Sequence, residues 1–400
     1  MMKRSMIKFL TQKNVKAEFH PAKKIAAIAA NEKFIRMKTN KCILQCLSAL
    51  LAVTFLFIAC KKDNATSDGG SSGKYDKEYY GRQSFVIALN SNYIVYDSVL
   101  KVTGLIDTLA QPGPFTTVLL DNNSIGWGGI NDGRITSFNP PANAIFILRS
   151  LIIPGAHSFK SLPVGSNQMF TSLAGNHLYI SKYPVGTDSA VCAVNGIRVF
   201  TIDFPSTNGP IQVIDSISPN LETYSSVLAY VNSTPELTFL SLALKRTGLD
   251  KLLDGSTAGS WTLLAPYDGA FKNSSDSSLN TYEGLLKADT AKLARILRYH
   301  IIPERNFLFD LEYKLKSQNS DTFRLNTMLS QHTLPFFTKG SGWPPFGYFF
   351  MGPGNVTPGG GSSDPTPKPA TLYQLSYPNY IANMVTANGT VHEIDNVLIP

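Results

Sequence analysis

Histidine is the first side chain to consider, because imidazole serves both proton transfer and metal binding. His300 and His392 could meet in the folded chain, but two histidines without a confirmed carboxylate make a poor metal site. His392 and Asp395 lie three residues apart on an expected strand, so they point to opposite faces and form no dyad. The chain contains no Gly-x-Ser-x-Gly elbow, His-Glu-x-x-His pair or glycine-rich phosphate loop. We therefore predict no catalytic residue, no metal and no cofactor.

Cysteine is the other residue type that combines nucleophilic and metal-binding chemistry, and the chain has four. Cys42 and Cys46 lie in a basic and apolar leader that Cys60 closes, which leaves Cys60 and Cys192 for the mature chain. No zinc-site spacing can be built from these two residues. Cys192 lies between apolar residues and is predicted to be a buried strand thiol without a disulfide partner.

Cys60 ends a segment that has the order of a secretory signal. A short positive stretch at residues 37–41 precedes an apolar run at 43–59, and a small residue stands directly before the cysteine. This pattern resembles the lipobox of bacterial lipoproteins, which implies a diacylglycerol on the Cys60 sulfur, cleavage before it and acylation of the new amine. Two or more acyl chains hold a protein stably on a membrane. The alternative is an uncleaved transmembrane helix, for which the apolar run is short.

The lipobox also divides the N-terminal part of the chain. Residues 1–36 precede everything a signal peptide needs, so we expect an untranslated or disordered extension there and a signal peptide at 37–59. Residues 60–78 would hold the lipid and a flexible tether rich in Ser and Gly. The Lys-Lys-Asp at 61–63 resembles the surface-export signal of Bacteroidetes lipoproteins, so we expect the outer membrane and possible surface exposure.

The formal charge of +8 belongs to this leader. The first 60 residues carry eleven of the 36 basic residues and only two of the 28 acidic ones, which leaves 25 basic and 26 acidic side chains in the rest. A nearly neutral body has no general attraction to phosphate backbones. Nucleic acid is therefore not a predicted partner.

The body contains an internal repeat. Three segments recur in the same order: 113–120 as 259–266, 148–154 as 297–303, and 208–215 as 388–395. A repeat of this length indicates two whole domains, which we place at 79–220 and 221–400. The separation grows from 146 residues for the first segment to 180 for the third, and an insertion at 335–369, rich in Pro, Gly and aromatic residues, accounts for the difference.

The three segments resemble the conserved blocks of the fasciclin domain. The second copy matches the first block at 261–271, the central Tyr-His at Tyr299 and His300, and the closing Asn-Gly-x-Ile-His-x-Ile-Asp block at 388–398. The first copy is degenerate, with Gln212 in place of the late histidine. The resemblance covers about residues 82 to 400. It implies an α+β fold with two tandem domains, each a twisted β-sandwich or wedge with several short helices packed on it.

Local patterns agree with this fold. Asp289 or Thr290 is expected to cap a helix with one apolar face. Ile302 precedes a proline and is therefore expected to be extended, so the chain leaves the helix as a strand. The Asn-Gly pairs at 208–209 and 388–389 indicate tight turns beside β-branched runs. Short helices early and strands late in each copy indicate an α+β domain.

Two groups of residues are candidate binding sites. The resemblance associates Tyr299 and His300 with receptor binding, and the alternative is that Tyr packs while His bonds backbone. The second group lies in the insertion, where residues 336–350 hold seven aromatic side chains in fifteen positions. We name Trp343, Phe346, Tyr348 and Phe349 as candidates from this group. One interpretation is a loop that presents them to a ligand, and the other is an aromatic strand that covers its own domain.

The sequence therefore predicts a cell-envelope lipoprotein that uses two fasciclin domains to bind protein or polysaccharide and is not an enzyme. Two linked modules raise avidity without one strong site. One alternative is an envelope enzyme such as a glycan hydrolase, because paired carboxylates leave no local signature and could converge between the domains. The other is a structural accessory subunit of an outer-membrane complex.

Overall fold

The computed structural model describes residues 80–122, 141–214, 221–274, 276–339, 347–352, 356–357, 366–367, 370–371, 374–376, 379–380 and 382–400. The predictions for the leader, Cys60 and the tether lie outside these residues, as do Trp343 and Phe346. Within the described ranges, no helix combines the length and apolar character that a membrane span requires.

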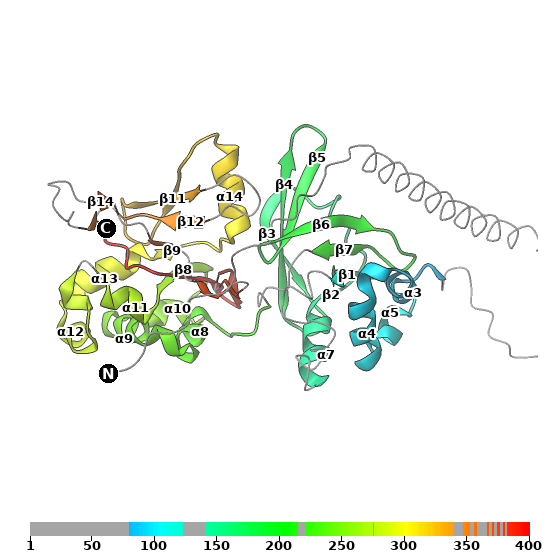
Figure 1. Ribbon diagram of the computed structural model, residues 1–400, viewed down its shortest axis with the longest axis horizontal. Helices are drawn as coiled ribbons and strands as arrows, with labels where there is room; N and C mark the ends of the chain where they lie inside the picture. The colour runs from blue at the N-terminus through cyan, green and yellow to red at the C-terminus, as the bar shows by residue number, and fades with distance from the viewer. Residues whose placement is uncertain are drawn as a thin grey trace, which may run out of the picture. The chain divides into compact units, whose positions relative to one another are not determined.

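The first domain combines short helices with a single seven-stranded sheet (Figure 1). The helices are α3 (Gln83–Ala88), η1 (Ser91–Tyr93), α4 (Ile94–Val102), α5 (Leu105–Leu109) and α7 (Pro141–Ser150). The strands are β1 (Phe115–Leu120), β2 (Ile152–Pro154), β3 (Gly165–Thr171), β4 (His177–Val185), β5 (Ser189–Val194), β6 (Ile197–Phe204) and β7 (Ile211–Ile214). Their order in the sheet is β2-β1-β7-β6-β5-β4-β3.

The second domain has more helix. Its helices are α8 (Val227–Ser233), η3 (Pro235–Leu237), α9 (Thr238–Thr247), α10 (Asp250–Leu253), α11 (Asp268–Lys272), η4 (Ser277–Leu279), α12 (Tyr282–Lys287), α13 (Thr290–Tyr299) and α14 (Leu308–Ser317). One sheet has the order β18-β19-β8-β9, formed by β8 (Trp261–Pro266), β9 (Ile301–Ile302), β18 (Met384–Thr386) and β19 (Gly389–Ile394).

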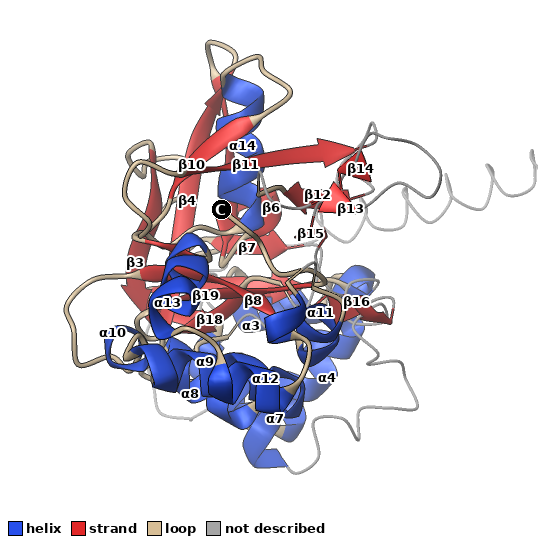
Figure 2. Ribbon diagram, turned by 90° about the vertical axis from the view of Figure 1, so that its left-hand side faces the viewer, coloured by secondary structure: helices blue, strands red, loops and turns tan. Residues whose placement is uncertain are grey.

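A second sheet of this domain has the order β10-β11-β12-β15. It consists of β10 (Phe323–Asn326), β11 (Thr333–Lys339), β12 (Gly347–Phe350) and β15 (Ala370–Thr371). Two small antiparallel pairs complete the described strands: β13 (Val356–Thr357) with β14 (Thr366–Pro367), and β16 (Gln374–Ser376) with β17 (Asn379–Tyr380). Helices and sheets thus make up both domains, as Figure 2 shows, and the predicted α+β class is confirmed.

The internal repeat of the sequence is also a repeat of strand pairing. In the first domain β1 runs antiparallel to β2 and parallel to β7, and in the second β8 runs antiparallel to β9 and parallel to β19. These strands are the three recurring segments. The first and last segments of each copy are therefore direct neighbours, although more than 80 residues separate them in the sequence.

The Asn-Gly turn holds the early helices in both domains. Asn388 Oδ1 accepts the Val227 N–H at 2.8 Å, and its Nδ2 donates to the Leu253 carbonyl at 3.1 Å. Asn208 makes the equivalent bonds to the start of α3 and the end of α5. A Cβ on Gly389 would lie 2.3 Å from a backbone oxygen of β8, so only glycine lets the parallel strands approach here. One dipeptide thus joins the sheet to the helices.

Local predictions around α13 are confirmed. Asp289 is the N-cap residue and accepts the Lys292 N–H at 2.7 Å. The apolar face of the helix is buried, and the chain continues into β9 at Ile301. Cys192 is fully buried in β5 and unpaired, as predicted, and burial raises the pKa of its thiol to about 11. Such a thiol stays protonated and acts as an apolar core group.

The aromatic segment begins inside a strand that both domains possess. Pro335 belongs to β11, which pairs with β10 and β12 as β4 pairs with β3 and β5 in the first domain. The additional residues of the second copy therefore lie mainly after β12, between Phe350 and Met384. This position is later than the predicted start of the insertion at residue 335. The offsets between the repeated segments showed that residues had been added, but they could not show that the β11–β12 hairpin has a counterpart in the first domain.

Candidate functional site

Tyr299 and His300 lie in the interior of the second domain. Tyr299 is 1% exposed, and its hydroxyl donates to the Thr333 carbonyl at 3.1 Å. His300 is fully buried between two backbone groups, with Nδ1 at 2.9 Å from the Ile296 carbonyl and Nε2 accepting the Leu398 N–H at 2.9 Å. Burial lowers the pKa of His300 to about 4, so its ring is neutral. Both side chains therefore pack inside the domain, and neither is accessible at its surface.

His392 has a similar role with the opposite tautomer. Its Nδ1 accepts the Asn383 N–H at 3.0 Å, and its Nε2–H donates to the Asn306 carbonyl at 3.0 Å. Burial lowers its pKa to about 4. Gln212 replaces it in the first domain, where its side-chain oxygen accepts the Asp203 N–H at 2.9 Å. Within the described ranges, no three His, Cys, Asp or Glu side chains are grouped to hold a metal ion.

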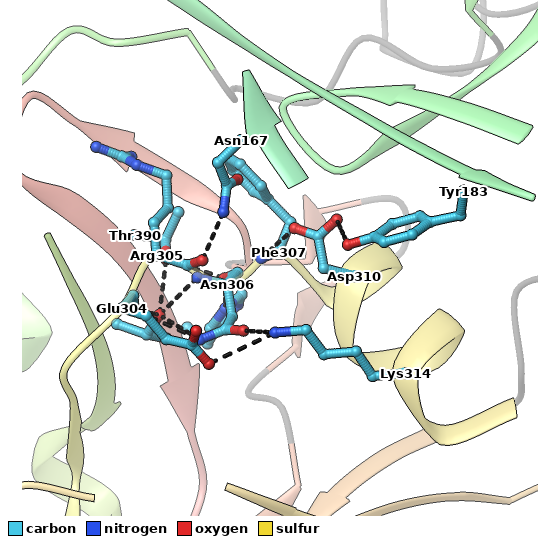
Figure 3. Close-up of polar contacts among 11 residues, drawn as sticks. Asn167, Tyr183, Glu304, Arg305, Asn306, Phe307, Asp310, Lys314 and Thr390 are labelled. Atoms are coloured by element: carbon cyan, nitrogen blue, oxygen red, sulfur yellow. Dashed lines mark hydrogen bonds and ion pairs between the residues drawn. The ribbon is translucent and has the colours of Figure 1, made fainter. Parts of the chain in front are cut away.

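The loop between β9 and α14 forms a polar junction with the first domain (Figure 3). The Arg305 carbonyl accepts a hydrogen bond from Asn167 Nδ2 at 2.7 Å. The Arg305 guanidinium lies over the ring of Tyr179, 3.9 Å from its centroid, and donates to the tyrosine hydroxyl at 3.2 Å. It also donates to the carbonyls of Thr386 at 2.9 Å and Gly389 at 2.5 Å. Arg305 is only 5% exposed, so these contacts compensate for the desolvation of its charge.

Helix α14 makes the second part of the junction. The Tyr183 hydroxyl donates to Asp310 Oδ1 at 2.9 Å, while Asp310 Oδ2 accepts the Phe307 N–H at 3.2 Å at the start of the helix. Tyr313 stacks on Tyr183 with ring centroids 4.1 Å apart, and Phe309 packs on the same ring. Burial raises the pKa of Asp310. In Figure 2 the helix lies beside β4 of the first domain and beside β10 and β11 of its own.

Carboxylates at this junction already have protein partners. Glu222 lies 3.1 Å from His177 Nδ1 and accepts the Tyr179 hydroxyl at 3.2 Å. Glu304 faces Lys314 at 3.5 Å, and Asp310 is bonded as described. This arrangement is that of a packed interface. Asp310 and Glu222 are mostly buried, whereas Glu304 is 55% exposed.

The hairpin of β11 and β12 separates its aromatic side chains between two faces. Phe336 and Phe350 are fully buried, with ring centroids 5.3 Å apart, and form the inner face. Tyr348 also turns inward, because its hydroxyl donates to Glu312 of α14 at 3.2 Å. Phe337 and Phe349 stack at 5.3 Å on the opposite face and are half-buried. The strand interpretation therefore applies to the described part of this segment.

We use the name outer aromatic face for the side of this sheet that carries Arg324, Pro335, Phe337 and Phe349. A pocket of about 610 Å³ lies at its β10 edge. The pocket is lined by Leu315, Lys316, Ser320, Asp321, Thr322, Arg324, Pro335, Phe337, Thr338 and Met351. The pocket is open to solvent rather than enclosed. Of the predicted candidates, Phe349 lies on this face, and the neighbouring Phe337 was not singled out.

The corresponding face of the first domain is already covered. There Ser181 lies opposite Ala193 and Tyr183 lies opposite Val191, and Tyr183 packs against Phe309 and Tyr313 of α14. Small residues let the helix approach closely. The second domain carries two phenylalanines on the same face of its hairpin. The two domains therefore use equivalent surfaces differently, one for internal packing and one beside a pocket.

Sequence reasoning also missed the junction. Arg305 and Asp310 follow Pro303 in a mixed polar and apolar stretch, and their partners Tyr179 and Tyr183 lie more than 120 residues away. No local signal marks an arginine that is buried by another domain. Arg324 is exposed and alternates with apolar residues on an edge strand, and that pattern was the only available signal for it.

Together these features define a chain of two tandem α+β domains built on one plan and packed through a specific junction. The model of the fasciclin domain matches residues 91–217 and 235–340, more than half of the sequence. The chain belongs to the fasciclin family. Domains of this family are generally adhesion-related modules and are typically not enzymes.

A solved structure of a domain pair from the insect cell adhesion molecule fasciclin I is similar to this chain. The identity is 17%, the TM-score is 0.35, and the match covers 78% of this chain and 98% of that one. No curated protein matches the sequence.

Proposed function

We propose that this protein is a lipid-anchored binding module of the bacterial cell envelope, which uses its second fasciclin domain to hold a protein or polysaccharide. The observation that carries the proposal is the pocket beside the outer aromatic face. Its lining combines an aromatic ring, hydroxyl groups and charges, which is the composition of a site for a polar ligand. The equivalent face of the first domain is covered, so binding is assigned to the second.

The membrane attachment rests on the sequence around Cys60. A positive stretch, an apolar run and a small residue before the cysteine support lipidation and placement at the outer membrane. Replacing Cys60→Ser should move the protein from the membrane fraction to the soluble fraction, with Cys192→Ser as a control that leaves it in place. A Cys60→Ser protein that stays with the membranes would contradict the anchor.

Binding can be tested with the part of the chain from Lys74 to Pro400, which forms one compact unit. We expect this protein to retain ligands on arrays of envelope glycans and proteins, and Phe337→Ala to weaken that binding. Tyr282→Ala is a matched control, because Tyr282 is an exposed aromatic residue of the same domain away from the pocket. Equal binding by all three proteins would place the site elsewhere. Release of cleaved glycan would instead support the hydrolase alternative.

A further inference from the structure

Arg324 is an exposed cation in the lining of the pocket. It lies on the edge strand β10, and it makes no ion pair or hydrogen bond within the part of the chain that is described. Arg305 and Arg246, in contrast, both donate to backbone carbonyls. An arginine that lines a pocket without a partner is available to pair with an anion from solution.

The other charges of the pocket limit what that anion can be. Lys316 is 2.5 Å from Glu312, a carboxylate that is only 1% exposed, so its charge is largely compensated. Asp321 lines the same pocket and is exposed. Lys316 is compensated by Glu312, so Arg324 is the cation that remains available beside the carboxylate of Asp321. These charges suit a ligand with a single negative charge. A second negative charge, as on a phosphate group, would add repulsion from Asp321 without gaining a second available cation.

The uncharged part of the lining selects among singly charged ligands. Phe337 contributes an aromatic ring, and Ser320, Thr322 and Thr338 contribute short polar groups. A sugar ring has an apolar C–H face that can pack on an aromatic ring, and hydroxyl groups that can bond hydroxyls and a carboxylate such as Asp321. A peptide bound as an added strand would instead depend on main-chain bonds and alternating side-chain pockets. The lining therefore favours a sugar.

We propose that this pocket binds a saccharide that carries a carboxylate, with its ring against Phe337, its hydroxyls near Asp321 and its carboxylate paired with Arg324. The guanidinium group presents two parallel donors that match the two oxygens of a carboxylate, which a neutral sugar lacks. This inference rests on the proposed function and specifies the ligand of the same site.

The test uses titration calorimetry on residues 74–400 with three probes: a glucuronic acid disaccharide, the corresponding glucose disaccharide and a diglutamate peptide. We expect the uronic acid to bind about tenfold more tightly than the neutral sugar, which corresponds to one charge-assisted contact. Arg324→Met should remove this preference, while Phe337→Ala should weaken binding of both sugars. Arg298→Met is the matched control, because Arg298 is exposed, makes no ion pair with the described residues and lies outside the pocket.

The outcomes separate this inference from the proposed function. Two results would overturn the role of the carboxylate but not the proposed function: equal affinity for the acidic and neutral sugars, or a preference for the acidic sugar that persists in a folded Arg324→Met variant. Binding of the peptide alone would contradict a saccharide ligand but would agree with the proposed binding function. If neither sugar nor peptide binds and no array ligand responds to Phe337→Ala, both proposals are wrong. Circular dichroism of each variant establishes that it is folded.

Discussion

Replacing Glu393 by glutamine removes an ionisable group from the core of the second domain. Glu393 lies on β19 and is fully buried. One carboxylate oxygen accepts the Tyr230 hydroxyl at 2.6 Å, and the other has no hydrogen-bond partner within the described residues. Burial raises the pKa of Glu393 to about 7, although the Tyr230 hydrogen bond acts in the opposite direction, and the nearby Glu236 raises it further.

The direction of the effect on stability follows from proton binding. The ordinary pKa of glutamate is 4.5, so between pH 4.5 and 7 the folded protein holds a proton that the unfolded chain releases. This stabilisation is complete below about pH 4.5 and is lost as the pH rises through about 7. A difference of roughly 2.5 pH units corresponds to about 3 kcal/mol of unfolding free energy.

The assay is urea denaturation of residues 74–400, wild type and Glu393→Gln, at pH 5 and at pH 8.5. The glutamine introduces a constant cost, because its amide hydrogens also lack partners, but this cost does not change with pH. We therefore expect the stability difference between the two proteins to shift by about 3 kcal/mol in favour of the variant at the higher pH.

Glu283→Gln is the control, since Glu283 is exposed and ion-paired with Lys287 at 2.5 Å. Its effect on stability should be small and nearly independent of pH across this range. If the stability of wild type and Glu393→Gln changes in parallel with pH, then Glu393 is ionised in the folded protein at pH 5, and the reasoning from its burial is wrong.

Two further predictions concern other buried ionisable groups. Arg305→Met should lower the free energy of unfolding by about 3 to 5 kcal/mol, because it leaves the contacts across the junction unpaired, whereas Arg298→Met should be nearly neutral; a small effect in chemical denaturation would refute the role of the junction. His300, with a pKa of about 4 in the folded protein against 6.5 ordinarily, contributes stability that is complete above pH 6.5 and is lost as the pH falls through 4, worth about 3 kcal/mol. An NMR titration should therefore find its ring neutral at pH 5.5, and protonation near pH 6.5 would contradict its burial.

Much of the fold could be predicted because its signals are local. Asp289 caps its helix through a bond to an amide three residues away, and the proline after Ile302 imposes extended geometry on that residue. The repeat also indicated which segments correspond, and the structure adds that the first and last of them are neighbouring strands in each domain. These features need no knowledge of distant parts of the chain.

The site was predicted less well because its determinants are not local. Alternation along a strand places Tyr348 and Phe349 on opposite faces, but only the position of α14 decides which of the two is turned inward. Tyr183 and Asp310 meet across 127 residues of sequence, and nothing near either residue indicates the other. The aromatic content of the segment drew attention to it, and the tertiary structure separated its buried side chains from its half-buried ones.

The junction between the domains has a mechanical consequence if the proposed lipid anchor and the proposed ligand site are combined. A ligand held by the second domain would pull against an anchor at the start of the chain, and the covalent path between the two domains is the short connection from β7 to α8. The contacts of Arg305, Tyr183 and α14 act in parallel with that connection. Under such tension these contacts would have to break before the two domains could separate, so the junction would resist force together with the polypeptide between the domains.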